Sequence, residues 1–114
     1  MDCIFCKIIK GDIPSYTIYE NEYVKCFLDV NPNSMGHTLI IPKKHFKDIY
    51  DIDTLYLSEI NKASKEVIKI LDEKLKPNGY KLVQNNGILQ EVKHYHLHII
   101  PSYNKKNNMD VSDV

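Results

Sequence analysis

The sequence shows no excess of charge of either sign and no long apolar run. Lysine and arginine together number 15, as do aspartate and glutamate, so the formal net charge is zero. Because nucleic-acid-binding domains are usually basic, we expect no nucleic-acid partner. No apolar run approaches the roughly 20 residues that a membrane-spanning helix needs, and the first residues lack the basic and apolar regions of a signal peptide. We therefore expect a cytoplasmic protein without a membrane partner.

Cysteine is also scarce: the chain of 114 residues has three, two of which form the pair Cys3-x-x-Cys6. So few thiols suit a reducing compartment better than a disulfide scaffold. The length allows one domain with one core, and a hydrophobic content of 43% is enough for the chain to fold. We expect a single domain over residues 1–114, with its core at about 3–101 and a polar tail at 102–114.

The most informative segment alternates three histidines with three apolar residues: His94, Tyr95, His96, Leu97, His98 and Ile99. Period-two alternation is typical of a half-buried strand, on which the rings would share one face about 6.6 Å apart, from ~3.3 Å of rise per residue. Such a row offers nucleophiles, acids, bases or metal ligands near neutral pH. Two alternatives stay open: rings that merely pack, and a hydrolytic zinc site with three histidine ligands, although such ligands usually come from several elements.

The rest of the chain predicts an α+β fold. The expected elements are a short helix at 3–10, a hairpin at 16–28, a loop at 29–36, a strand from 37 that ends at Pro42, an amphipathic helix at 53–76 and strands at 80–85 and 94–101. Asp53 is the expected N-cap of the long helix. We therefore expect an antiparallel sheet of about five strands with one long helix and a short N-terminal helix.

The histidine segment resembles the motif of the histidine triad (HIT) family of nucleotide hydrolases and transferases. A second specific match is the segment 37–45, and the resemblance covers roughly 3–101. It implies a HIT-like fold, a homodimer, and a purine nucleotide substrate that resembles AMP. The implied chemistry is hydrolysis of a phosphoramidate or nucleotide, or nucleotidyl transfer, with release of AMP or GMP. The alternative is a non-catalytic protein that binds a nucleotide or a partner through the same pocket.

The resemblance assigns catalytic roles to three histidines. His96 would attack the α-phosphorus and form a covalent nucleotidyl-histidine, which divides one hard step into two easier ones. His98 would hold a non-bridging phosphate oxygen as charge develops. His37 would lie beside the triad as a supporting partner, although from the residues alone it could equally be a capping or turn residue.

The resemblance also implies which residues hold the nucleotide. Asp29 would accept hydrogen bonds from the ribose hydroxyls, and Asn85 would contact the sugar-phosphate, since a carboxylate accepts and an amide both donates and accepts. The base would lie between three apolar side chains: Ile8, Phe27 and Val30. From the residues alone, these three would be read as core.

The loop before the triad departs from the family pattern. Gln90 matches a family glutamine that precedes the triad, and the resemblance places Gln90 and Glu91 among the residues that contact the substrate. Leu89 stands where a glycine is usual, however, and the loop is about two residues short. Glycine lets a backbone approach a ligand closely, so the phosphate cradle is expected to differ. Glu91 stands where many relatives have a small hydroxyl residue. An acid facing a phosphate would repel it, so Glu91 either points away or contacts a cationic leaving group.

The pair Cys3 and Cys6 resembles half of a structural zinc site. At positions i and i+3 of a helix the two thiols share a face. In the zinc-bearing branch of the family, such a pair joins two histidines, which here would be His45 and His94. Alternatives are a redox pair, for which no accompanying βαβ pattern is found, and two ordinary small residues. His94 would then be a metal ligand and not part of the catalytic row, and the metal would not be needed for catalysis.

Overall fold

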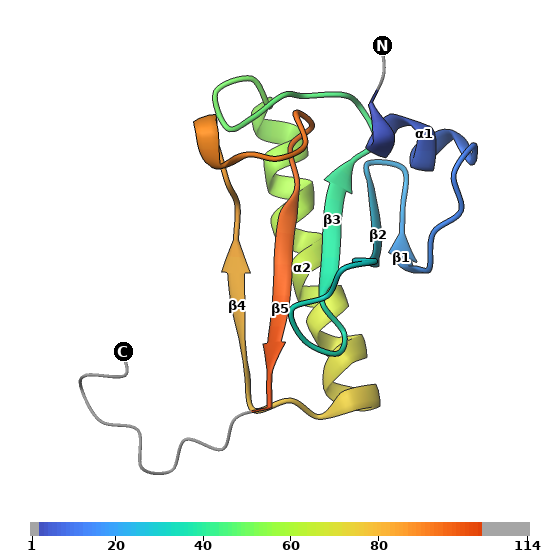
Figure 1. Ribbon diagram of the computed structural model, residues 1–114, viewed down its shortest axis with the longest axis vertical. Helices are drawn as coiled ribbons and strands as arrows, with labels where there is room; N and C mark the ends of the chain where they lie inside the picture. The colour runs from blue at the N-terminus through green and yellow to red at the C-terminus, as the bar shows by residue number, and fades with distance from the viewer. Residues whose placement is uncertain (1–2, 104–114) are drawn as a thin grey trace, which may run out of the picture.

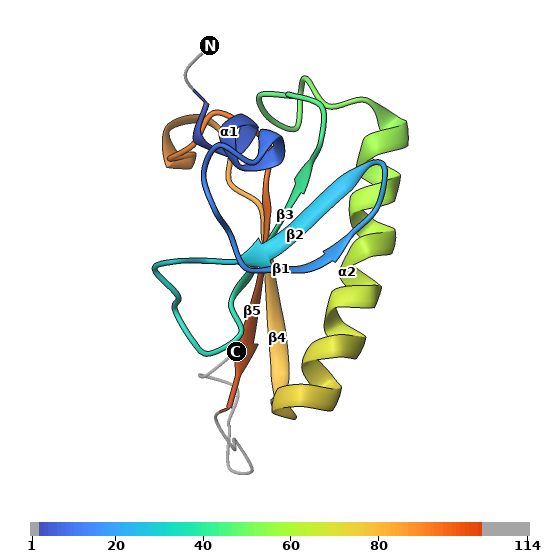
Figure 2. The same ribbon diagram turned by 90° about the vertical axis from the view of Figure 1, so that its right-hand side faces the viewer.

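The computed structural model describes residues 3–103 and shows the expected α+β architecture (Figure 1). The elements are α1 (Ile4–Lys10), β1 (Thr17–Glu20), β2 (Val24–Leu28), β3 (Thr38–Pro42), α2 (Thr54–Leu75), β4 (Gly79–Val83), the 3-10 turn η1 (Gly87–Leu89) and β5 (Leu97–Ser102). The strands form one antiparallel sheet in the order β1-β2-β3-β5-β4. Figure 2 shows α2 along one face of this sheet and α1 on the opposite side.

The long helix forms where the apolar periodicity predicts it. The Asp53 carboxylate caps its first turn by accepting the amide of Tyr56 at 2.9 Å, and the helix ends at Leu75, followed by the C-cap Lys76 in the left-handed region. Its buried stripe packs on the sheet residues that face it, and the main core consists of Val24, Cys26, Ile40, Phe46, Ile52, Ile60, Ala63, Val67, Leu71, Tyr95, Leu97 and Ile99. Along the described part of the chain, no helix has both the length and the apolar character needed to cross a bilayer.

A second, smaller core lies on the other face of the sheet, under α1. Phe5 and Ile8 of this helix pack with Phe27, Leu39 and Ile41 of β2 and β3. The helix stops at Gly11, which has a φ of 89° and donates its amide to the Ile8 carbonyl at 3.1 Å. A short helix is thereby fixed to the face of the sheet on which the histidines lie.

The expected strand at 94–101 is shorter than the alternation suggested, because β5 begins only at Leu97. The pairing of β3 with β5 stops at Ile40 opposite Leu97, and continuing the register would place Tyr95 opposite Pro42. Proline has no amide hydrogen for the ladder. The amide of Tyr95 instead donates to the Phe46 carbonyl at 2.7 Å. His94 and His96 therefore precede the strand, although Tyr95 is buried in the main core as predicted.

Candidate functional site

A cleft of about 580 Å³ lies between α1, the ends of β2 and β4, and β5. This volume is within the usual range for small-molecule sites. Nine of the residues predicted to act on or hold a nucleotide line it: Ile8, Phe27, Asp29, Val30, His37, Asn85, Glu91, His96 and His98. Gln90 does not line it: its side chain is buried and its amide nitrogen donates to the Lys47 carbonyl at 2.5 Å. The structure thus brings together all of the expected cleft residues except Gln90.

The His96 ring is held in one tautomer by the backbone. Its Nδ1 lies 2.8 Å from the carbonyl oxygen of His94. A carbonyl can only accept, so Nδ1 carries the hydrogen and Nε2 keeps a free lone pair. Burial lowers the pKa of His96, while the hydrogen bond to His94 and the charges of Asp29 and Glu91 oppose this. The ring is therefore neutral near physiological pH, in the form that can act as a nucleophile.

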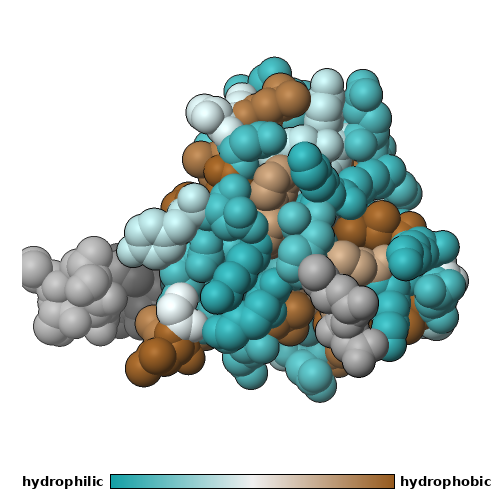
Figure 3. Space-filling view, turned by 90° about the horizontal axis from the view of Figure 1, so that it is seen from above, coloured by the Kyte–Doolittle hydropathy of each residue, from teal (hydrophilic) through white to brown (hydrophobic). Residues whose placement is uncertain are grey.

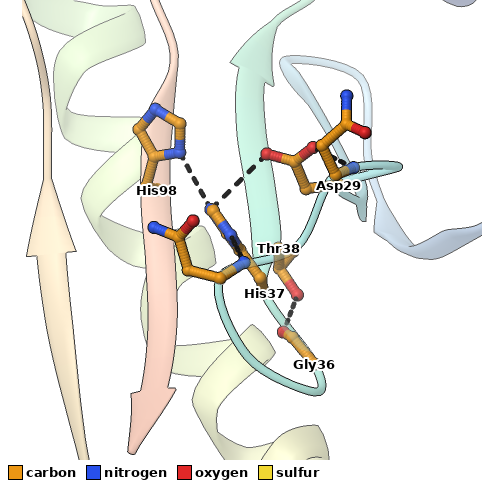
Figure 4. Close-up of polar contacts among 7 residues, drawn as sticks. Asp29, Gly36, His37, Thr38 and His98 are labelled. Atoms are coloured by element: carbon orange, nitrogen blue, oxygen red, sulfur yellow. Dashed lines mark hydrogen bonds and ion pairs between the residues drawn. The ribbon is translucent and has the colours of Figure 1, made fainter.

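A chain of hydrogen bonds fixes His37 and His98 in the same way (Figure 4). The backbone amide of Asn33 donates to His37 Nδ1 at 3.0 Å, so His37 carries its hydrogen on Nε2. That nitrogen is 2.9 Å from His98 Nδ1 and 3.6 Å from the Asp29 carboxylate. His98 Nδ1 must then accept, which leaves the hydrogen on His98 Nε2. His98 can consequently donate from Nε2, the nitrogen that points away from His37.

Burial also keeps these two supporting rings neutral. It lowers the pKa of His37, although the charge of Asp29 opposes the change. The pKa of His98 falls to about 4, because of burial first and then the neighbouring rings of His96 and His37. The rings of His96 and His98 lie 5.0 Å apart between centroids, so a nucleophile and a donor stand side by side in the cleft.

The side chains expected to enclose a base differ in their exposure. Ile8 and Phe27 are buried in the smaller core, whereas Val30 is 83% exposed at the rim of the cleft. Asp29 uses one carboxylate oxygen to accept the Asn31 amide at 2.9 Å. Its carboxylate still has acceptor sites to spare, since it offers about four.

Phe5 is a site residue that the sequence reasoning missed. Its ring stands edge-on to those of His96, His94 and Phe27, with centroid distances of 5.1, 5.8 and 5.9 Å. It forms part of the cleft wall and limits how the His96 ring can tilt. The available signal was its spacing of three residues from Ile8, which predicts a shared buried face but not the partner on that face.

Four potential metal ligands meet next to the cleft: Cys3, Cys6, His45 and His94. Their ligand atoms all lie within 4.8 Å of one another. His94 Nδ1 is 3.3 Å from Cys3 Sγ and 3.1 Å from His45 Nδ1, and Cys6 Sγ is 3.3 Å from His45 Nδ1. Two thiols and two imidazoles are a donor set that suits tetrahedral zinc. The cluster could hold such an ion.

The orientation of His94 agrees with a ligand role. Its Nε2 lies 3.0 Å from the Pro42 carbonyl, so this nitrogen carries the hydrogen and the Nδ1 lone pair faces the thiols. Burial, the largest influence, lowers the pKa of His94 to about 4 and keeps the ring neutral. His94 therefore lies outside the cleft, and of the three alternating rings only His96 and His98 line it.

Comparison with known proteins places these features in context. The model of the HIT domain matches residues 10–105. An uncharacterized HIT-like protein of Methanocaldococcus jannaschii is 48% identical over 103 residues, which are 89% of this chain and 79% of that protein. The adenosine 5'-monophosphoramidase of Saccharomyces cerevisiae is 41% identical over 111 residues, which are 96% of this chain and 68% of that protein.

A solved structure supports the same relationship. The crystal structure of a Zn-bound histidine triad family protein from Mycobacterium smegmatis superposes with a TM-score of 0.87 at 32% identity, covering 97% of this chain and 81% of that one. The fold, the paired rings in the cleft and the family match agree, and the chain belongs to the HIT family.

Proposed function

We propose that this chain hydrolyses purine nucleoside 5'-phosphoramidates through a covalent nucleotidyl-histidine and releases AMP or GMP. The observation that carries the proposal is the free Nε2 lone pair of neutral His96 in a nucleotide-sized cleft. The naming of a relative at 41% identity as an adenosine 5'-monophosphoramidase supports this substrate class. A nucleoside monophosphate linked to an amine is therefore the substrate type that we expect.

In the proposed first step, His96 Nε2 attacks the phosphorus and forms a new P–N bond to the ring. The bond between phosphorus and the leaving amine breaks, its electron pair stays on the amine nitrogen, and that nitrogen takes up a proton from water. In the second step a water molecule attacks the same phosphorus, displaces His96 and gives a proton to solvent. One water is consumed overall, and its oxygen ends on the nucleoside monophosphate.

The surrounding residues would position the substrate and stabilise charge. His98 Nε2–H would donate to a non-bridging oxygen, where negative charge grows during the attack. Asp29 would accept the ribose hydroxyls and Asn85 would contact the sugar-phosphate, so that the phosphorus arrives in line with His96. Ile8, Phe27 and Val30 would be the walls for the base. These side chains all line one cleft, which supports the assignment.

Gln90 would act through the loop and not on the substrate. Its side chain ties the segment before the triad to the Lys47 carbonyl. This contact holds the backbone that leads to Glu91 and His94. We therefore assign Gln90 a positioning role, in place of the direct contact that the resemblance implied.

Zinc is the metal that we propose for the cluster of Cys3, Cys6, His45 and His94. Four protein ligands leave no open position for water, so its role would be structural. When bound, the ion would link α1 to the segment that follows β3 and to the segment that precedes β5.

We also propose that the protein is a homodimer and that it works in the reducing cytoplasm. The family resemblance supports the dimer, and three cysteines that form no disulfide agree with a reducing compartment.

Replacing the nucleophile tests the proposed function. We expect His96→Ala to lower the turnover of adenosine 5'-phosphoramidate by about 10⁴-fold or more, by analogy with the loss of other covalent nucleophiles. Binding of AMP, measured by calorimetry, should stay within about threefold of wild type, because the base and ribose contacts remain. Glu73→Gln on the exposed face of α2 serves as the control and should retain activity. A wild-type protein that binds AMP but turns over no phosphoramidate would indicate the non-catalytic alternative.

A further inference from the structure

Glu91 lies where the cleft meets a second hollow. It lines the cleft together with His96, and it also lines an adjoining hollow of about 490 Å³. The other residues around this hollow are Cys3, Ile4, His45, Lys47, Val92 and Lys93. Ile4 and Val92 belong to both spaces, as Glu91 does. A ligand that extends from the cleft past His96 would therefore meet Glu91 before it enters the second hollow.

The Glu91 carboxylate is exposed, and the described part of the chain offers it no hydrogen-bonding or ion-pair partner. Within residues 3–103 it takes part in no hydrogen bond and no ion pair, whereas Lys93 beside it donates to the carbonyls of Gly87 and Gln90 at 3.1 and 2.9 Å. Glu91 and His96 line the same cleft, so this charge lies at the cleft in which the nucleophile acts. Glu91 thus presents an unpaired negative charge to whatever lies near His96.

Glu91 and Asp29 mark opposite ends of the site. Asp29 lies beside His37 and His98, at the end where we place the ribose. Glu91 shares its hollow with Cys3 and His45, at the end of the metal cluster. In Figure 1 the loop that carries Glu91 lies at the end of the sheet near α1, and the loop that follows β2 lies toward the other end. With the nucleoside at Asp29, the group beyond the phosphorus is left with the Glu91 end.

We propose that Glu91 selects substrates whose leaving amine carries a second, positively charged group close to the scissile P–N bond. This inference rests on the proposed function and narrows its substrate class. A carboxylate repels an anionic leaving group and attracts a cationic one, and an unpaired carboxylate loses no existing contact when it binds a cation. The surface at this end is mainly hydrophilic with a few hydrophobic residues between, as a charged leaving group requires (Figure 3).

Two lysines near Glu91 could instead favour an anionic leaving group. Lys47 and Lys93 both line the second hollow. The ammonium of Lys93 is held by two backbone carbonyls, but Lys47 is exposed and could attract an anionic leaving group that extends further. The test therefore includes a substrate with a negative charge in the same position.

The experiment compares three adenosine 5'-phosphoramidates with leaving amines of similar size. Each leaving amine is an ethylamine that carries a different group on its far carbon. The three groups are a trimethylammonium cation, a neutral tert-butyl group of the same shape, and a carboxylate. For wild type we expect the highest kcat/KM with the cation. In Glu91→Gln the ratio of cationic to neutral kcat/KM should fall about fivefold, the scale of an exposed charge pair. The decisive comparison is between the ratio in wild type and the ratio in Glu91→Gln. The charge on the leaving amine also changes how readily that amine leaves, but this effect is the same in both proteins.

Matched variants separate the charge of Glu91 from its size. Glu91→Asp keeps the carboxylate and should keep most of the preference, and Glu73→Gln on α2 should leave the ratio at the wild-type value. Raising the ionic strength should weaken the wild-type preference. Equal ratios in wild type and Glu91→Gln would overturn the inference, as would a preference for the carboxylate substrate. Absence of cleavage of all three by wild type would instead remove the proposed function, and the inference with it.

Discussion

At the scale of single residues, the site depends on which nitrogen of each ring carries the hydrogen. Backbone groups decide this for three rings: the His94 carbonyl for His96, the Pro42 carbonyl for His94 and the Asn33 amide for His37. His96 and His94 each leave their second nitrogen for chemistry or for a metal, whereas His37 uses its second nitrogen to orient His98. The arrangement requires that the rings stay neutral, which burial favours.

Protonation of His98 is therefore expected to destabilise the fold. Its pKa is about 4 in the folded chain, against about 6.5 when unfolded, so the unfolded chain binds more protons between these values. The free energy of unfolding should be highest above pH ~6.5 and should fall as the pH drops toward ~4. Urea unfolding of wild type and His98→Gln across this range checks it. The variant should show a smaller dependence on pH, and an equal dependence in both would contradict the assignment.

The sequence predicted which residues meet in the cleft better than the contacts that they make there. Nine of the residues that line the cleft were named from the histidine motif and the matched segments. The anchoring of Gln90 on Lys47 and the contact of Phe5 with His96 did not follow. A backbone carbonyl has no side-chain signature, and a buried phenylalanine reads only as core.

At the scale of elements, the short helix α1 joins the four potential metal ligands to the cleft. It supplies Cys6 as a potential ligand, its N-cap Cys3 supplies another, and its Phe5 packs on His96. His45 follows β3 and His94 precedes β5, so the cluster links three segments that are distant in sequence. A seven-residue helix is too short to be stable alone, so it depends on these contacts.

Removal of a cluster ligand should loosen α1 and leave the chemistry of His96 intact. We expect the purified wild type to contain one zinc ion per chain, Cys3→Ser to lose it, and His98→Ala to keep it. Loss of the ion should lower Tm by on the order of 10 °C. Elemental analysis and thermal unfolding give the two readouts. Prompt loss of activity on chelation, below the temperature at which the protein unfolds, would instead favour a catalytic metal.

The regular elements were the most predictable part of the fold. The periodicity of α2 and its Asp53 cap are local properties, and the structure confirms both. The start of β5 was not local, because it depends on where β3 offers hydrogen bonds. That ladder ends at Ile40 opposite Leu97, two residues short of Pro42. The alternation from His94 to His96 therefore reflects the burial of Tyr95 and not a strand. Pattern reasoning therefore predicted the buried side correctly and the extent of the strand incorrectly.

At the scale of the whole molecule, the sheet separates a stability core from a functional face. Figure 2 shows α2 on one side of the sheet, where the main core lies, and α1 on the other. The cleft and the cluster of cysteine and histidine side chains lie on the side of α1, because both include residues of that helix. Substitutions on the cleft face can therefore change chemistry with little effect on the main core. The two edge strands of the sheet are β1 and β4.

The proposed homodimer is tested by mass in solution. Sedimentation equilibrium of the full chain should give about twice its mass of 13.3 kDa at micromolar concentration. A mass equal to one chain over this concentration range would show that the resemblance does not extend to assembly.

The central claim is that His96 becomes covalently bonded to the nucleotide, and trapping tests it most directly. The protein is mixed with an adenosine 5'-phosphoramidate, quenched within the first turnover and digested, and the modified peptide is mapped by mass spectrometry. The account predicts a nucleotidyl group on His96, present in wild type and absent in His96→Ala. A modification on His98 or His37, or rapid turnover with no trapped adduct on any histidine, would contradict it.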